Sequence, residues 1–226
     1  MFYRFVKRGF DLFNSLLAMI VLSPLFLFIS IGIKASSKGP VFYISERMGK
    51  NGIPFRMFKF RSMHIKQEGS VESKYLVNEQ RIFGFGRFLR KSKLDELPQI
   101  INIFLGNMSV VGPRPYPKRF TDSNYGGDYA EILTVRPGLA CFDSLYDYAH
   151  GELFVTDEKQ YAEQVIPVRT ELARMYVRKA GIMTDLSCIF RTVQLMIEIV
   201  LLKKKSFSLT KTEIEARDRV RLIVSS

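Results

Sequence analysis

The stretch that decides the fold is LFNSLLAMIVLSPLFLFISIGI, which runs from Leu12 to Ile33 without a charged residue. At a rise of about 1.5 Å per residue, a straight helix of this length would cross a hydrocarbon layer of roughly 30 Å. No small-residue cleavage signal follows the stretch, which argues against a removable signal peptide. The sequence therefore predicts a membrane element within residues 1–38.

Ser23 and Pro24 interrupt this stretch near its middle. Proline removes a helical hydrogen bond and bends the helix, which leaves two halves that are each too short to cross the layer. Basic residues flank the stretch on both sides: Arg4, Lys7, Arg8, Lys34 and Lys38. Because positive charge favours the cytoplasmic side, both ends are drawn to the same face. The residues alone favour a spanning helix and a re-entrant hairpin about equally.

The composition calls for an acidic partner. The 226 residues carry 34 lysines and arginines against 22 aspartates and glutamates, a net charge of +12. Such a charge suits nucleic acid, anionic lipid or a phosphorylated substrate without choosing among them. Cys141 and Cys188 have apolar neighbours and no metal-ligand spacing, so we expect two reduced, buried thiols and no zinc site. His64 and His150 are isolated and receive no catalytic role.

A β-hairpin is predicted after the membrane element. Two apolar runs, residues 41–44 and 55–60, flank Asn51-Gly52, and Asn-Gly between apolar runs is the strongest local signal for a hairpin. Side chains alternate along a strand, so Lys59 and Arg61 lie on one face. Two cations on one face could hold phosphate, although a solvated face is the simpler interpretation.

Two adjacent carboxylates, Asp95 and Glu96, follow a basic run from Arg87 to Lys93. One interpretation is a helix start, in which Ser92 and Asp95 form a capping box. The other is a phosphoryl-transfer site, because a carboxylate held among arginines stays ionised and can attack phosphorus. These residues alone favour the first interpretation. The two are compatible, since the start of a helix also binds anions.

Arg114 stands between two prolines. The residue before a proline is restricted to extended conformations, so the backbone of Arg114 is held in place. An arginine that is already fixed loses less entropy when its planar guanidinium binds a phosphate. The sequence therefore offers a phosphate ligand here, while a turn without a function is the simpler alternative.

Two segments combine apolar and basic residues in a way that suits a membrane surface. Residues 81–93 interleave phenylalanines with arginines and lysines, and core packing or base stacking would also explain these rings. Residues 185–202 carry an apolar stripe that ends at Lys203-Lys204-Lys205, and either lipid contact or docking on the core explains it. Residues 64–79 are predicted to form a polar loop around a short helix, and residues 210–224 a charged helix.

The chain also carries an ordered series of short motifs: Lys7-Arg8-Gly9-Phe10-Asp11, Ser23-Pro24, Gly39-Pro40-Val41-Phe42-Tyr43, Glu46-Arg47-Met48-Gly49, Lys59-Phe60-Arg61-Ser62-Met63, Gly86-Arg87-Phe88-Leu89-Arg90, Leu94-Asp95-Glu96-Leu97-Pro98-Gln99, Gly106-Asn107-Met108-Ser109, Val111-Gly112-Pro113-Arg114-Pro115 and Val135-Arg136-Pro137-Gly138. In this order they resemble the monotopic phosphoglycosyl transferases, bacterial sugar transferases that start glycan assembly on polyprenyl phosphate. The resemblance is dense over residues 1–140 and loose over residues 141–202.

The resemblance implies a mostly α-helical, monotopic membrane protein with a small β-hairpin and interfacial amphipathic helices. The implied parts are a re-entrant helical hairpin (residues 1–38), a catalytic domain (residues 39–202) and a charged C-terminal extension (residues 203–226). The implied location is the cytoplasmic face of the bacterial inner membrane. Because the chain starts a few residues before the apolar stretch, we expect a minimal catalytic core without further N-terminal spans.

The resemblance also implies the chemistry. Asp95 is the nucleophile, and Glu96 is the second catalytic residue and helps to hold Mg²⁺. Ser23 and Pro24 make the membrane kink. The basic residues assigned to substrate binding are Lys59, Arg61, Arg90, Arg114 and Arg136. Asp95 would attack the sugar-bearing phosphorus of a UDP-sugar and release UMP, and polyprenyl (undecaprenyl) phosphate would then take the sugar phosphate.

The implied partners are a UDP-sugar, undecaprenyl phosphate and membrane phospholipid, without nucleic acid, and a homodimer is compatible with them. A rival hypothesis, from the net charge and residues 81–93, is a non-catalytic membrane-anchored protein that binds nucleic acid or anionic lipid. The chain departs from the family pattern after Gly138, where relatives often continue with Ile-Thr-Gly and a tryptophan. Here Leu139 is followed by residues 140–148, with no tryptophan, so donor recognition stays open.

Overall fold

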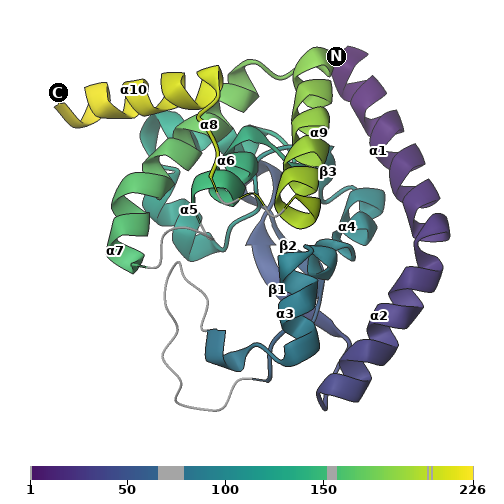
Figure 1. The fold of residues 1–226 in the computed structure, drawn as a ribbon. Coiled ribbons are helices and arrows are strands. Elements are labelled where there is room, and N and C mark those ends of the chain that lie inside the picture. The colour runs from purple at the N-terminus through teal and green to yellow at the C-terminus, as the bar shows by residue number, and fades with distance from the viewer. Residues whose placement is uncertain (1, 66–78, 152–156, 203, 205, 226) are drawn as a thin grey trace.

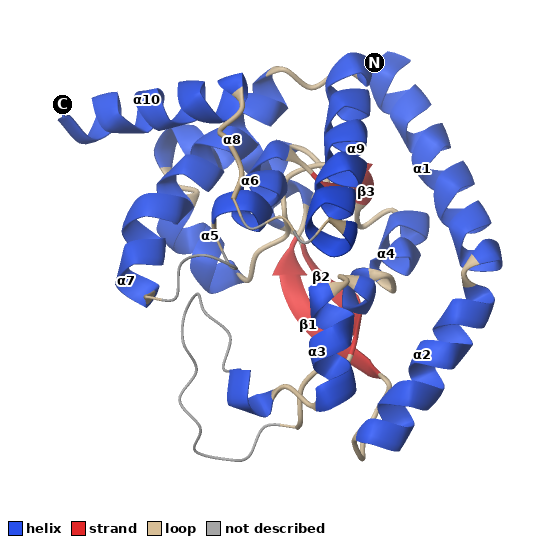
Figure 2. Cartoon of the chain, viewed as in Figure 1, coloured by secondary structure: helices blue, strands red, loops and turns tan. Residues whose placement is uncertain are grey.

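The computed structural model describes residues 2–65, 79–151, 157–202, 204 and 206–225 (Figure 1). In chain order the elements are α1 (Phe2–Val21), α2 (Ser23–Ser36), β1 (Phe42–Met48), β2 (Pro54–Phe60), α3 (Gly84–Lys91), α4 (Gln99–Leu105), β3 (Ser109–Val111), α5 (Lys118–Asn124), β4 (Gly138–Ala140), α6 (Phe142–His150), α7 (Glu158–Gln160), α8 (Ile166–Arg178), α9 (Ile182–Met196) and α10 (Lys211–Ser225). Figure 2 shows the short strands in the interior, with helices around them. A mostly helical fold with a small antiparallel sheet is thus confirmed. The predicted loop of residues 64–79 lies mainly outside the described residues.

The N-terminal element is a pair of helices, α1 and α2, which meet at a bend of 60°. Pro24 lies in the first turn of α2, where its missing N–H costs no helical hydrogen bond. The Ser23 hydroxyl donates to the carbonyl of Ile20 at 2.8 Å. Among the described residues, no single helix is long and apolar enough to span a membrane, and only this bent pair reaches that length and composition together. The predicted break at Ser23-Pro24 is confirmed.

Three charged side chains of the first motif dock α1 on the domain. Lys7 Nζ lies 2.6 Å from Asp185 Oδ2 in α9, which runs beside α1 in Figure 1. Arg8 donates to the last carbonyls of α4, that of Ile103 at 2.7 Å and that of Phe104 at 2.9 Å. A cation suits this position because the carbonyls at a helix end lack helical partners.

Asp11, from the same motif, is buried and binds β3. Its Oδ1 accepts from the backbone N–H of Val110 at 2.9 Å and from the Ser109 hydroxyl at 3.1 Å. Together with Lys7 and Arg8, it fixes one face of α1 to three separate elements. The charged residues of this motif therefore dock α1 on the domain, a structural role that the sequence pattern does not predict.

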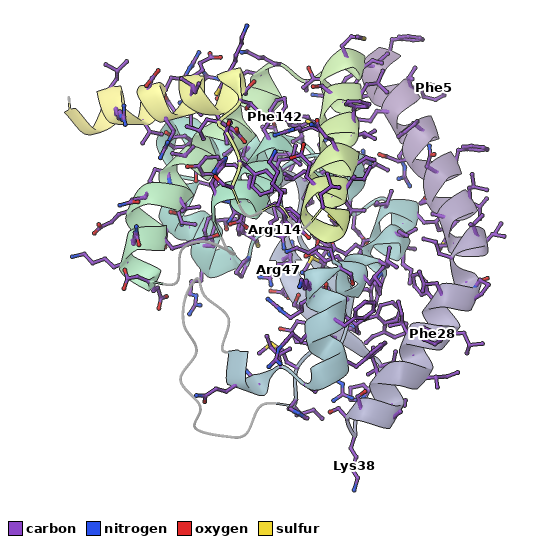
Figure 3. All side chains as sticks on the ribbon, in the orientation of Figure 1. Phe5, Phe28, Lys38, Arg47, Arg114 and Phe142 are labelled. Carbon is purple, nitrogen blue, oxygen red and sulfur yellow. The ribbon has the colours of Figure 1, made fainter. Side chains whose placement is uncertain are left out.

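The second helix of the pair, α2, contributes to the hydrophobic core. Ile29 and Ile33 of α2 are fully buried against Phe60, Phe83 and Leu89. The opposite side of each limb is exposed and apolar: Phe2, Phe5, Phe13, Ile20, Val21, Leu27, Phe28 and Ile31. In Figure 3 the labelled Phe5 and Phe28 lie along the outer side of the pair. The pair thus packs with one side and presents the other to its surroundings.

Helix α9 is oriented the same way. Its buried residues are Asp185, Cys188 and Leu195. Within the predicted stripe Ile189 packs on the core, while Leu186, Phe190 and Val193 point outward and are 50%, 74% and 54% exposed. Of the two alternatives for this stripe, docking on the core is therefore wrong for these three residues. Cys141 and Cys188 are free and buried, as predicted.

Strands β1 and β2 form the predicted antiparallel hairpin. Tyr43 lies opposite Lys59 and Arg47 opposite Phe55, so all four belong to one face. In the turn Asn51 has a φ of 58° and Gly52 a φ of 71°, the left-handed values that these residue types tolerate best.

A second pair, β3 with β4, is parallel and joins segments that the sequence does not pair. A Cβ on Gly138 would lie 2.2 Å from the backbone nitrogen of Gly112, so the close approach of these strands requires glycine. This pairing positions the segment that carries Arg114.

One prediction about a local boundary needs correction. Ser92 does not cap the following helix: it follows α3, and its hydroxyl donates back to the carbonyl of Phe88 at 2.8 Å. The basic side chains and rings before it form a helix that continues to Lys91, so the chain cannot begin a new helix at Ser92.

Helix α10, within the predicted C-terminal extension, packs on α8 with Ala216 fully buried.

Asp11→Ala tests the docking of α1. The substitution leaves the Val110 N–H and the Ser109 hydroxyl without their buried acceptor, so we expect a loss of about 1–3 kcal/mol of stability. The control is Asn14→Ala, whose side chain donates to Phe10 in the same helix and should cost less than about 0.5 kcal/mol. Denaturant unfolding of the detergent-solubilised proteins measures both, and equal stabilities would contradict the docking role.

Candidate functional site

The acidic pair lies in a single 3₁₀ turn, Leu94–Glu96, between α3 and α4. Lys93 precedes it with a φ of 55°, in the left-handed region, which ends α3. The turn packs against β2. A short turn on rigid neighbours fixes both carboxylates relative to the hairpin.

Glu96 is held by two cations. Its Oε1 accepts from Lys59 Nζ at 2.7 Å and from Arg114 Nη2 at 2.8 Å. Burial alone would raise the pKa of Glu96, but the charges of Arg114 and Lys59 outweigh it and hold that pKa well below its ordinary value. The charge of Glu96 in turn raises the pKa of Arg114. Glu96 is therefore an ionised, structurally fixed carboxylate at neutral pH.

Asp95 has a different environment although it is the adjacent residue. It is 5% exposed, and its Oδ1 is buried with no hydrogen-bond donor among the described residues. Burial, followed by the charge of Glu96, raises the pKa of Asp95, and the charges of Lys59, Arg90 and Lys93 oppose the rise. An unsatisfied buried oxygen requires an explanation, and a role in chemistry is one.

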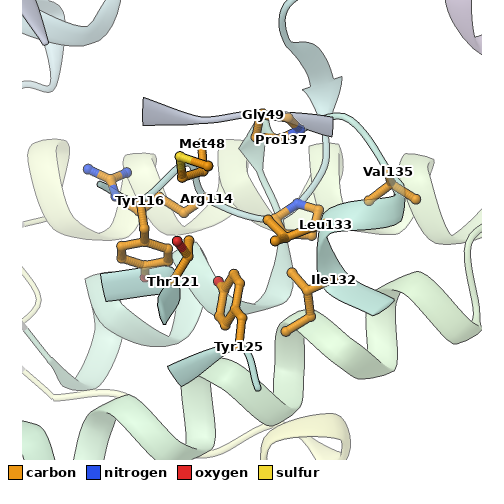
Figure 4. Close-up of a pocket in the computed structure, with 11 residues that line it drawn as sticks. Met48, Gly49, Arg114, Tyr116, Thr121, Tyr125, Ile132, Leu133, Val135 and Pro137 are labelled. Carbon is orange, nitrogen blue, oxygen red and sulfur yellow. The ribbon is translucent and has the colours of Figure 1, made fainter. Parts of the chain in front are cut away.

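The backbone of Arg114 is held by a contact with α6. Its backbone N–H donates to Asp143 Oδ2 at 3.2 Å, so α6 helps to hold the segment between the two prolines. The cavity in Figure 4, which Arg114 lines together with Tyr116, Tyr125 and Leu133, has room for about one water molecule. This cavity is too small for a nucleotide base.

Other predicted site residues divide into two groups. Arg90 lies close enough to Asp95 for its charge to lower the pKa of that carboxyl. Arg61 instead faces the segment after α2, where it donates to the carbonyls of Ser37, Lys38 and Pro40 at 2.6–2.8 Å. These donors are committed to the backbone, so the structure gives Arg61 a structural task.

Arg136 also lies apart from the acidic turn. Its Nε donates to the carbonyl of Gly106 at 2.8 Å, at the end of α4. Lys93, which was not assigned to the site, places its ammonium 4.2 Å from the ring centroid of Tyr148, a residue of the segment where the chain departs from the family pattern. This contact joins that segment to the acidic turn.

The sequence analysis missed Arg47. The strand register places it on the face of Lys59, and the backbone N–H of the next residue, Met48, donates to the carbonyl of Tyr116 at 2.8 Å. Burial and then the charge of Arg114 lower the pKa of Arg47. Strand alternation from Lys59 across the hairpin was the signal that could have found it.

The residues at the turn fit a magnesium ion in one specific way. Among the described residues there is no group of three or more His, Cys, Asp or Glu side chains that could enclose a metal. Mg²⁺ usually takes one or two carboxylates and completes its shell with water and substrate phosphates. Glu96 can supply its second oxygen, which makes no hydrogen bond within the described residues, and Asp95 lies beside it.

The chain belongs to the bacterial sugar transferase family, whose family model matches residues 2–199. This match confirms the resemblance to phosphoglycosyl transferases. The match includes the hairpin, the acidic turn and the segment of Arg114, and it ends before α10.

Several relatives have names that state a reaction. The UDP-glucose:undecaprenyl-phosphate glucose-1-phosphate transferase of Escherichia coli K12 is 32% identical over 84% of this chain and 40% of its own length. The UDP-N-acetylgalactosamine-undecaprenyl-phosphate N-acetylgalactosaminephosphotransferase of Aeromonas hydrophila is 31% identical over 85% of the chain and 44% of its own length. The chain therefore spans about two fifths of these relatives. It covers 93% of the exopolysaccharide production protein PSS of Rhizobium leguminosarum bv. phaseoli, at 46% identity.

Glu96→Gln tests the ion pairs. Because Glu96 is 14% exposed and neutralises Lys59 and Arg114, we expect a loss of about 1–3 kcal/mol at pH 7. The folded-state pKa of Glu96 is lowered, so its contribution is present above the ordinary value of 4.5 and is lost as pH falls further. Unfolding at pH 7 and at lower pH should therefore show a difference between the two proteins that narrows in acid.

The control is Glu163→Gln. Glu163 forms an exposed pair with Lys159 at 3.9 Å, and such pairs contribute little. A Glu96→Gln protein as stable as wild type at pH 7 would contradict the ion-pair argument.

Proposed function

We propose that this chain is the catalytic unit of a Mg²⁺-dependent phosphoglycosyl transferase, which moves a sugar phosphate from a UDP-sugar to undecaprenyl phosphate. The observation that carries the proposal is the contrast within the acidic pair. Glu96 is neutralised by Lys59 and Arg114, whereas the buried Asp95 keeps an oxygen without a hydrogen-bond donor from any described residue. The reactions in the names of the relatives from Escherichia coli and Aeromonas hydrophila support this class of reaction.

In the first step the Asp95 carboxylate attacks the sugar-bearing phosphorus of the UDP-sugar. A bond forms between the carboxylate oxygen and phosphorus, and the bond from phosphorus to the bridging oxygen breaks. UMP leaves with that oxygen and its electron pair. The products are an aspartyl sugar phosphate and UMP, and no net proton transfer is required.

In the second step an oxygen of undecaprenyl phosphate attacks the same phosphorus. The bond between phosphorus and the Asp95 oxygen breaks, the carboxylate is restored, and undecaprenyl diphosphate sugar is released. Lys59 and Arg114 stabilise negative charge on the transferring group and hold Glu96 in place. A bound Mg²⁺ held by Glu96 would neutralise charge on the donor phosphates.

The lipid acceptor requires a site at the membrane surface. The exposed apolar side of α1 and α2, together with the outward residues of α9, supports insertion of the bent pair into one leaflet as a re-entrant hairpin. Lys34 and Lys38 at one end and Arg4 at the other support a common, cytoplasmic side. The acidic turn would then lie where the phosphate of a lipid acceptor is found.

Asp95→Asn should reduce UMP release from a UDP-sugar, with Mg²⁺ and undecaprenyl phosphate present, by roughly a thousandfold or more. The amide keeps the shape of the side chain but cannot form the acyl phosphate. Intact-protein mass spectrometry with donor alone should find the sugar phosphate adduct on wild type and not on the variant. The control, Asp122→Asn, changes an exposed residue paired with Lys118 and should stay within twofold. Wild-type turnover by Asp95→Asn would reject Asp95 as the nucleophile. Absence of UMP release by wild type would instead favour the rival binding protein.

The hairpin is tested by single cysteines at Arg4 and Lys38, both exposed. Because both ends are proposed to lie on the cytoplasmic side, a membrane-impermeant maleimide should label both only in inverted vesicles and neither in intact cells. Labelling from opposite sides would establish a spanning segment instead. Cys141 and Cys188 are buried, so wild type provides the background.

A further inference from the structure

Arg47 is a partly buried cation without an anionic partner among the described residues. Its Nε is buried without a hydrogen-bond acceptor. Neither a hydrogen bond nor an ion pair joins its side chain to any residue in the described part of the chain. Taking a guanidinium out of water without pairing it is unfavourable. The unfavourable burial of this unpaired guanidinium therefore requires a functional explanation.

The position of Arg47 is fixed by backbone hydrogen bonds. It lies in β1 opposite Phe55 of β2, on the face that also presents Lys59. The hydrogen bond from Met48 N to Tyr116 O at 2.8 Å ties the end of β1 to the segment two residues beyond Arg114. Figure 3 shows the labelled Arg47 and Arg114 next to each other in the centre of the view. The two guanidinium groups are thus brought together by the fold.

Two adjacent arginines repel each other unless an anion lies between them. Glu96 takes hydrogen bonds from Arg114 and Lys59 but from Arg47 it takes none. Glu96 therefore leaves Arg47 without a hydrogen bond. A diphosphate offers several anionic oxygens within a few ångströms, which matches two neighbouring planar donors better than a single carboxylate does.

We infer that Arg47 binds the diphosphate of the nucleotide-sugar donor together with Arg114. This inference rests on the proposed function and adds to it a residue, on β1, that recognises the donor before any bond is broken. Arg47 acts in the donor step, because the diphosphate that it binds belongs to the UDP-sugar, and the UDP-sugar reacts first. Arg56 provides a matched comparison, since it lies on the exposed, opposite face of the same hairpin, opposite Glu46.

The experiment compares wild type with Arg47→Gln, Arg47→Lys and Arg56→Gln. UMP release is measured against donor concentration at saturating undecaprenyl phosphate and Mg²⁺. We expect Arg47→Gln to lower kcat/KM for the donor roughly tenfold to hundredfold, mainly through KM. Arg47→Lys should recover part of the loss, and Arg56→Gln should stay within twofold of wild type.

Thermal unfolding separates binding from structure. Arg47→Gln removes an unpaired charge, so its Tm without ligand should equal or exceed that of wild type, while the rise in Tm on adding UDP and Mg²⁺ should shrink. An arginine that merely supports the fold would instead lower the Tm when replaced. A lower Tm combined with an unchanged donor KM would therefore overturn the inference.

Single-turnover measurements assign the phosphate to the donor or to the acceptor. Arg47→Gln should slow adduct formation at low donor concentration and leave the decay of a preformed adduct with undecaprenyl phosphate unchanged. A defect confined to adduct decay would place Arg47 on the acceptor phosphate and overturn the donor assignment. If wild type itself releases no UMP from any UDP-sugar, the proposed function fails; if wild type is active and Arg47→Gln matches it, only the inference about Arg47 fails.

Discussion

The Oε1 atom of Glu96 is the point on which the site depends. Lys59 reaches it from β2, Arg114 from the segment after β3, and Glu96 itself lies in the turn between α3 and α4. Three pieces of chain that are distant in sequence therefore meet at one oxygen. Because two cations are engaged by Glu96, neither forms an ion pair with Asp95. The pKa values of the two carboxylates shift in opposite directions although the residues are neighbours, and the difference comes from what surrounds each one.

Helix α1, one of the two apolar helices, fixes the position of the acidic site relative to that pair. Arg8 binds the end of α4, the helix that follows the acidic turn, and Asp11 binds β3, the strand that leads to Arg114. Both contacts come from one face of one helix. A change in the position of α1 would therefore be transmitted to both sides of the site, since each contact is a short, directional hydrogen bond to backbone. This linkage suits the proposed enzyme, whose acceptor would be embedded in lipid while its chemistry occurs in a protein site.

The sequence predicts the parts of this structure that depend on neighbouring residues. The break at Pro24 and the turn at Asn51-Gly52 follow from local conformational preferences, and both are observed. Ser92 was wrongly predicted as a cap because residue types at a three-residue spacing do not reveal whether the preceding helix already includes them. The parallel pairing of β3 with β4 involves residues far apart in sequence, which no local pattern encodes.

The same limit applies to the site residues. Arg61 and Arg47 are both arginines within short motifs of the hairpin region. Only the folded chain shows that the first binds the backbone of residues 37–40, while the second has no hydrogen-bond partner in the part of the chain that the structure describes. Residue type predicts that an arginine or lysine can bind phosphate. Whether its N–H donors are free to do so depends on the tertiary contacts. The proximity of Asp95 and Glu96, by contrast, needs no fold to establish it, because the two residues are adjacent in sequence.

Two buried polar atoms, Asp95 Oδ1 and Arg47 Nε, have no hydrogen-bond partner among the described residues. Arg47 is fixed in a strand and Asp95 in a 3₁₀ turn, on elements that are held by backbone hydrogen bonds. Such groups suit a third component that contacts both. In the proposed reaction a substrate phosphate would do this, since its oxygens would accept from the guanidinium while its phosphorus would receive the carboxylate.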